Sequence, residues 1–248
     1  MKEYKSIIIA LIAGICAVIC VSIFSGSIVS YKKTSGSGGL TATGSANCDF
    51  EADLIVWRGE FSSYGQTTKD AYRQINKDAK LVKEYLEKNG VTEDEMVFSS
   101  VTISKRWVTR YNDDGNRTGE YLDGYDLCQN ISITSLDVDK IEGISRDISE
   151  LIESGVEFAS YEPEYYYTKL DELKLELIEQ ATQNAKDRID LVADGSGTKP
   201  GKLLNATLGV FQITPQNSNT EYSYGGTFDT SSRLKNVSVT VKLNYTAE

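Results

Sequence analysis

Residues 101–133, VTISKRWVTRYNDDGNRTGEYLDGYDLCQNISI, consist of two alternating stretches on either side of an Asp-rich turn. In the first stretch Ile103 and Trp107 alternate with polar neighbours, which is typical of a strand that buries one face. The turn carries an Asp-Gly pair that tolerates positive φ, and the return stretch places Leu127 on its apolar face. The segment therefore predicts a β-hairpin with one buried face.

Helical periodicity flanks this hairpin on both sides. Apolar or alanine residues recur every three or four positions over 71–86 and over 141–151, and a glycine follows each stretch. A short apolar run at 54–61 precedes the first helix and a Tyr-rich stretch at 156–167 follows the second, and both predict strands. The resulting order, βαββαβ, predicts an α+β fold of two layers, an antiparallel sheet with both helices on one face.

The C-terminal third of the chain predicts an αββ extension of this core. A stripe of Leu, Ala, Ile and Val residues indicates a helix over 173–192, and an apolar stretch at 203–213 predicts a strand. Val and Leu alternate with polar residues over 237–246, which is the clearest strand pattern of the chain. We expect core and extension to form one domain, over residues 46–248.

The N-terminal region predicts a membrane anchor. After a short head, 1–6, residues 7–29 contain no charged side chain, and about 20 apolar residues suffice to cross a bilayer as a helix. A cleaved signal peptide is the alternative, because Ser25-Gly26-Ser27 offers a site of small residues. The following Gly/Ser-rich stretch, 30–45, predicts a flexible linker. We expect a single-pass protein of the cell membrane with its domain on the extracytoplasmic side, or a secreted protein if the segment is cleaved.

Composition narrows the function classes. The formal net charge of -10 disfavours a nucleic-acid partner, because phosphate binding requires a basic surface. The chain has no histidine, the residue most used as a general base and as a zinc ligand. We therefore expect no metal, no cofactor and no catalytic site.

Two groups of acidic residues could have a chemical role: the hairpin turn as a calcium-binding loop, and a later group as catalytic carboxylates. A calcium loop fails in the hairpin, because alignment on Gly115 puts Arg110 at the first ligand position and Tyr121 at the twelfth. A pair of carboxylates about 5–10 Å apart across a cleft would support glycoside hydrolysis. The acidic residues considered for this role are Glu162, Glu164, Asp171 and Glu172.

Cysteine and tyrosine residues supply the remaining candidates. Cys48 and Cys128 could form a disulfide in an oxidising compartment if their α-carbons lie close together, and the sequence leaves this open. Tyrosine buries a large area at low entropic cost, so tyrosine clusters are candidate partner surfaces. The residues considered are Tyr165, Tyr166, Tyr167, Tyr222 and Tyr224.

The stretch Leu173–Val210 carries a resemblance to a known family. Small residues at four-residue spacing, Ala181 and Ala185, lead to a glycine-containing turn at Gly195 and Gly201 and then to a strand. With the strands and helices before it, this arrangement resembles the SIMPL domain family over about residues 46–246. The resemblance implies an α+β fold in an exported or envelope-associated bacterial protein. Ring-forming or other oligomeric members and links to stress tolerance are further implied, without an accepted catalytic site, so no catalytic residue is transferred.

These observations lead to one expected function with two alternatives. We expect a membrane-anchored, non-catalytic binding or assembly protein of the cell envelope, with a homo-oligomer or an unidentified envelope component as its partner. The alternatives are an envelope glycan hydrolase that uses the acidic residues, and a module that binds a small ligand near the tyrosines.

Overall fold

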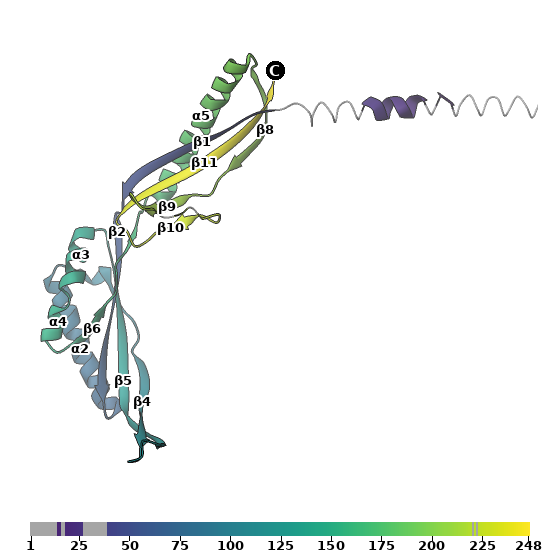
Figure 1. Cartoon of the computed structure of the whole chain (residues 1–248). Coiled ribbons are helices and arrows are strands. Elements are labelled where there is room, and N and C mark those ends of the chain that lie inside the picture. Colours follow the sequence, from purple (N-terminus) through teal and green to yellow (C-terminus); the bar gives the residue numbers. More distant parts are fainter. Residues whose placement is uncertain (1–13, 16–17, 27–38, 220, 222) are drawn as a thin grey trace, which may run out of the picture. The chain divides into compact units, whose positions relative to one another are not determined.

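The computed structural model describes residues 14–15, 18–26, 39–219, 221 and 223–248 (Figure 1). The protein is α+β, which confirms the predicted fold class. The sequence predicts one domain over residues 46–248, and the structure groups the chain into two compact units. Unit 1 comprises residues up to Ala46 with Leu175–Val210 and Ser238–Glu248, and unit 2 comprises Asn47–Lys174 and Phe211–Val237. Local patterns identify most of the helices and strands but do not reveal which of them share a core.

Two sheets replace the single predicted sheet. The elements are β1 (Leu40–Glu51), β2 (Leu54–Gly65), α2 (Thr68–Lys88), η1 (Glu93–Glu95), β3 (Met96–Phe98), β4 (Thr102–Tyr111), β5 (Arg117–Ser135), α3 (Val138–Asp147), α4 (Glu150–Glu153), β6 (Glu157–Ser160), β7 (Glu164–Tyr166), α5 (Leu170–Ser196), β8 (Pro200–Leu208), β9 (Gln212–Pro215), β10 (Thr227–Phe228) and β11 (Leu234–Ala247). The six-stranded sheet has the order β3-β5-β2-β6, with β4 also on β5 and β7 also on β2. The five-stranded sheet has the order β1-β11-β9-β10, with β8 on β11, and β9 and β10 are parallel.

The structure describes only part of the predicted anchor and of the predicted linker. Most of residues 7–29 lies outside the described residues, and the described stretch 18–26 is helical. Among the helices that the structure describes, none has the length and apolar character needed to cross a membrane. Residues 40–45, which the sequence assigned to the linker, form the first half of β1. The first strand that the structure describes therefore begins at Leu40, within the predicted linker.

In unit 2, the helices cover one side of the six-stranded sheet (Figure 1). Helix α2 begins where Thr67 accepts a hydrogen bond from the Asp70 backbone N–H at 3.2 Å, and it buries the predicted stripe. In β2 the residues that face the helices are buried and alternate with exposed or half-buried ones. The core of this unit includes Ile55, Trp57, Phe61, Ile75, Val82, Leu86, Leu127, Ile131, Ile133, Ile141 and Ile144.

The hairpin is present, but its first strand is not buried as predicted. The side chains of Ile103 and Trp107 on β4 are 54% and 55% exposed. Their cross-strand partners differ: Leu127, opposite Ile103, is fully buried, whereas Leu122, opposite Trp107, is 40% exposed. Alternation identified the two faces of β4 correctly, but a face is buried only where another layer covers it.

Three predicted elements are interrupted. The stretch 156–167 forms two short strands, β6 and β7, and Pro163, which has no N–H for a ladder, lies between them. The stretch 203–213 divides into β8 and β9 around Gly209, where an added Cβ would lie 2.5 Å from Thr240 Oγ1. The second helix divides into α3 and α4.

Unit 1 is held together by close packing of α5 on β1. The buried stripe of the helix is built from Leu177, Ala181, Ala185, Ile189 and Ala193. A Cβ on Gly44 of β1 would lie 2.2 Å from the backbone oxygen of Ala181 and 2.3 Å from the backbone nitrogen of Ala185. The small residues at four-residue spacing therefore let the helix backbone approach the strand backbone.

Candidate functional site

The five candidate tyrosines do not form one exposed surface. Tyr165 is only 8% exposed, and its hydroxyl donates to the carboxylate of Glu142. Burial and this carboxylate raise the pKa of Tyr165 to about 12. Tyr166 and Tyr167 are half-buried, with rings packed near Phe228 and Phe50 respectively.

Of the other two candidate tyrosines, the structure describes only one. Tyr224 is fully exposed. Tyr222 lies outside the described residues. The tyrosine hypothesis therefore retains one exposed side chain in the part of the chain that the structure describes, which is too little for a contact surface.

Cys48 and Cys128 are both free thiols, so the disulfide that the sequence left open is not present. Cys48 lies on β1 and Cys128 on β5, in different sheets. Burial, with a contribution from Glu60, raises the pKa of Cys128 to about 11. A thiol with a raised pKa is rarely a thiolate at neutral pH, which disfavours redox chemistry at this position.

The four acidic candidates for hydrolysis have different surroundings. Glu164 forms an ion pair with Arg58 at 2.9 Å, and this partner holds the pKa of the Glu164 carboxyl below its usual value. A general acid in glycoside hydrolysis requires a raised pKa, so Glu164 is poorly suited. Asp171 pairs with Lys174 on the surface of α5 at 3.3 Å, and Glu172 lies one residue further along this helix.

Glu162 lines a pocket of unit 2. The pocket, of ≈ 260 Å³, is formed by Glu142, Ser145, Arg146, Ser160, Tyr161, Glu162, Pro163 and Tyr165. Its lining includes none of the other three acidic candidates. The structure therefore does not bring the four carboxylates together in this pocket.

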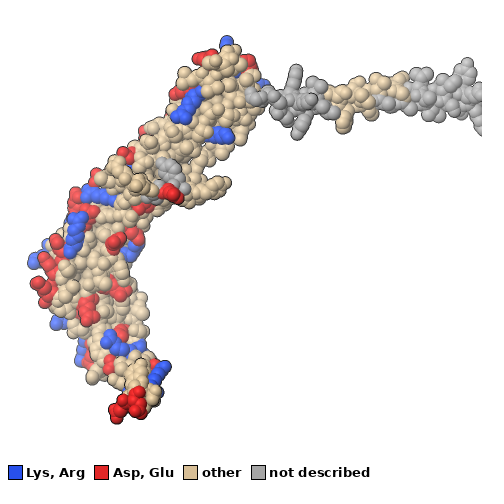
Figure 2. All heavy atoms as spheres, viewed as in Figure 1, with Lys and Arg blue, Asp and Glu red and all other residues tan. Residues whose placement is uncertain are grey.

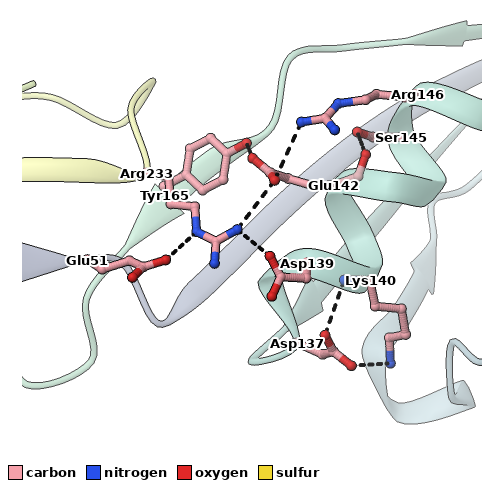
Figure 3. Close-up of polar contacts among 9 residues, drawn as sticks. All are labelled: Glu51, Asp137, Asp139, Lys140, Glu142, Ser145, Arg146, Tyr165 and Arg233. Atoms are coloured by element: carbon pink, nitrogen blue, oxygen red, sulfur yellow. Dashed lines mark hydrogen bonds and ion pairs between the residues drawn. The ribbon is translucent and has the colours of Figure 1, made fainter.

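A polar cluster around Arg233 adjoins the pocket and was not found in the sequence (Figure 3). Arg233, in the segment just before β11, donates from Nε to Glu51 at the end of β1 at 2.6 Å. Its Nη1 donates to Asp139 and, at 3.4 Å, to Glu142, both on α3. The arginine holds the pKa of Asp139 below its usual value. The cluster thus ties three distant segments of unit 2 together.

Glu142 is the centre of this cluster. Its two carboxylate oxygens accept from Tyr165 and Arg233, and Arg146 lies 3.5 Å away. The carboxylate is only 18% exposed. Its partners use the hydrogen-bonding capacity of this carboxylate. The cluster is therefore better suited to holding segments of the fold together than to proton transfer.

The free edge of β4 is the most exposed regular element of unit 2. In the part of the chain that the structure describes, β4 pairs with β5 alone, so its other edge has no strand partner. Three large side chains alternate along one face: Ile103, Trp107 and Tyr111, the last 66% exposed. The ends of β4 and β5 extend past α2 (Figure 1).

One charged residue, Lys105, lies on this face between Ile103 and Trp107, and the two arginines of β4 lie on the other face. Arg106 points to the opposite face, where it forms an ion pair with Asp126 and lies 4.6 Å from the centre of the Tyr64 ring. Arg110 likewise lies 4.9 Å from the centre of the Tyr121 ring. Acidic side chains gather at the tip of the hairpin, as Figure 2 shows. An edge strand with exposed large side chains is the arrangement that other strands can extend.

A comparison with models of protein families identifies a family for this chain. A family model described as "SIMPL: Protein of unknown function (DUF541)" matches residues 40–245. This span begins where β1 begins and ends within β11. No curated protein matches the chain.

Proposed function

Because the chain belongs to the SIMPL (DUF541) family, whose function is unknown, we propose that it is a non-catalytic assembly protein of the cell envelope. In this proposal residues 7–29 anchor it in the membrane and the folded units lie on the extracytoplasmic side. A second copy of the chain binds the free edge of β4.

The exposed β4 edge carries the proposal. Ten residues, Thr102–Tyr111, offer backbone N–H and C=O groups along a strand with no partner on its outer side among the described residues. Soluble proteins usually protect such an edge by shortening it, charging it or covering it. Lys105, on the same face as Ile103 and Trp107, and Arg110 give some protection here, yet these two apolar side chains are both more than half exposed.

A second copy fits this edge because an isologous contact places identical surfaces together. The apolar face of β4 would lie beside the same face of the partner, on one side of the joined sheet, and no other protein of matching pattern is required. Extended pairing of two edges also satisfies the backbone groups that are now free.

The molar mass of the full chain tests this proposal. We expect light scattering in detergent micelles, after subtraction of the detergent, to give a mass that rises with protein concentration above the 27.4 kDa of one copy. A mass of one copy over a hundredfold concentration range would overturn the assembly proposal.

A small-ligand module remains a second candidate because of the pocket beside Glu142. The pocket combines the guanidinium of Arg146, the carboxylate of Glu162 and the ring of Tyr161, so it suits a small polar molecule. Screening by thermal shift tests this candidate: a ligand should raise the melting temperature of the wild type but not of an Arg146→Ala, Glu162→Gln double variant. An equal rise in both proteins would exclude this pocket as the binding site.

A further inference from the structure

The ends of several strands and of one helix lie together at one end of unit 1. The backbone N–H of Lys199 donates to Glu248 and that of Glu248 donates to Lys199, each at 2.9 Å. Leu40, the first residue of β1, packs in one cluster with Ile189 and Ala193 near the C-terminal end of α5. Figure 1 shows the start of β1, the end of α5, the start of β8 and the C-terminus at this end.

Large apolar side chains are exposed at the same end. Leu191 and Val192 on the last turns of α5 are 72% and 51% exposed, although the neighbouring Ile189 is buried. Leu203 and Leu204 on β8 are 51% and 49% exposed. We call these four residues the leucine end.

The local sheet geometry explains why the leucines on β8 remain uncovered. Leu203 is opposite Tyr245 of β11, and Leu204 is the extra residue of a register shift in this pair of strands. Strand β8 pairs with β11 alone among the described residues, so it forms an edge of its sheet. Helix α5 covers β1, and the β8 leucines are left without a covering layer.

The short connection between the apolar segment and β1 limits how far the leucine end can lie from a membrane that holds this segment. Ten residues, 30–39, separate the apolar segment 7–29 from Leu40. Fully extended, they span at most about 35 Å, and as a flexible coil they average about 18 Å. If residues 7–29 are anchored, the leucine end is therefore kept close to the bilayer. At the high effective concentration that such a tether gives, even a weak contact is populated.

We propose that the leucine end lies against the lipid surface, with Leu191, Leu203 and Leu204 entering the headgroup region. This inference rests on the membrane anchor of the proposed function. Apolar insertion is the main attraction, because Lys199 and Lys202 are outnumbered at this end by Asp190, Asp194 and Glu248. The contact would hold unit 1 in a fixed orientation on the membrane instead of leaving it free on its tether.

The test uses the full chain in liposomes with a fluorophore at single positions. All four native cysteines are replaced by serine, and the probe is attached to Leu191→Cys or to Leu204→Cys. Leu175→Cys is the matched control, because this leucine is on the same helix, 69% exposed, about 24 Å away along the helix axis. Lipids with a nitroxide near the headgroup quench a probe that touches the bilayer.

We expect quenching of the probes at 191 and 204 to be at least twofold stronger than at 175. Equal quenching at all three positions, in protein that floats with the liposomes, would overturn the lipid contact while leaving the anchor intact. Protein that does not float would overturn the anchor and this inference with it. Probes at 191 or 204 that quench one another between copies, without quenching by lipid, would assign the leucine end to a second copy and overturn the lipid contact.

Discussion

The two tryptophans of the chain lie in the same six-stranded sheet in opposite surroundings. Trp57 on β2 is fully buried, and its Nε1 donates to Ser160 Oγ at 3.1 Å. Trp107 on β4 is 55% exposed. Both belong to alternating stretches, so the difference comes from the layer above them: helices cover β2 and leave the outer part of the hairpin open. The covered part of the sheet supplies stability, and the uncovered part is available to a partner.

The largest effect is expected from removal of the covered tryptophan. Trp57→Ala should lower the free energy of unfolding by about 3–5 kcal/mol, because it leaves a cavity in the core and removes one hydrogen bond to Ser160. Urea unfolding followed by circular dichroism measures this change. A loss below about 1 kcal/mol would show that the covered part of the sheet is not the stabilising part.

Cys128 lies at the border between the two parts, opposite Ser62 on β2 and Thr102 on β4. Its pKa of about 11, against an ordinary value of 9.0, lowers the thiolate fraction at neutral pH about a hundredfold. In a variant that keeps only this cysteine, the rate of alkylation should rise with pH up to about 11 in the folded protein. In urea it should level near 9.

The same shift has a consequence for stability. The folded state holds the Cys128 proton more tightly than the unfolded state, so the contribution of this group is complete below about pH 9 and is lost as the pH rises towards 11. An alkylation rate that levels near pH 9 in the folded protein would show that the Cys128 thiol is as exposed to water as the outer part of the hairpin. The border between the covered and the uncovered part of the sheet would then lie nearer to the helices than the structure places it.

Two arginines give a smaller contrast between the parts. Arg233→Ala should destabilise unit 2 by about 1–2 kcal/mol, because it leaves the mostly buried Glu142 with fewer donors, while the exposed contact to Asp139 adds little. Arg106→Ala, which breaks the exposed pair with Asp126 on the hairpin, should cost less. Thermal unfolding of both variants measures the difference. A greater loss for Arg106→Ala would contradict the distinction.

The smallest effect on stability is expected from the uncovered tryptophan. Trp107→Ala should change the free energy of unfolding of one copy by no more than about 0.5 kcal/mol, because the side chain packs under no helix. Unfolding at the lowest protein concentration that gives a signal measures it. A loss as large as that of Trp57→Ala would show that the hairpin is part of the core.

Local patterns in the sequence predicted the elements well. The stripe of α2, its end near Asn89 and the alternation over 237–246 appear in the structure because each follows from helix or strand period alone. The division into two units was not predictable in this way, since it depends on which elements share a core. β1 was missed because residues 40–45, small and polar, resemble a linker until Gly44 is seen against the backbone of α5.

The candidate sites were predictable to a lesser extent. Arg233 comes from a polar loop without any periodic signal, and only the folded chain brings it to Glu51, Asp139 and Glu142. The exposure of Trp107 could not be predicted either, because a strand with one apolar face looks the same whether or not a helix covers that face. The sequence did identify Tyr165 as notable, but its burial makes it part of the core.

Pairing of two copies of the chain along the free edge of β4 predicts different molar masses for two matched variants. Trp107→Lys places a charge on the apolar face of β4, and Tyr72→Lys does the same at a 52% exposed aromatic residue of α2. Light scattering of the full chain at one high concentration should give the mass of one copy for Trp107→Lys and the wild-type multiple for Tyr72→Lys. An unchanged multiple in Trp107→Lys would contradict this pairing.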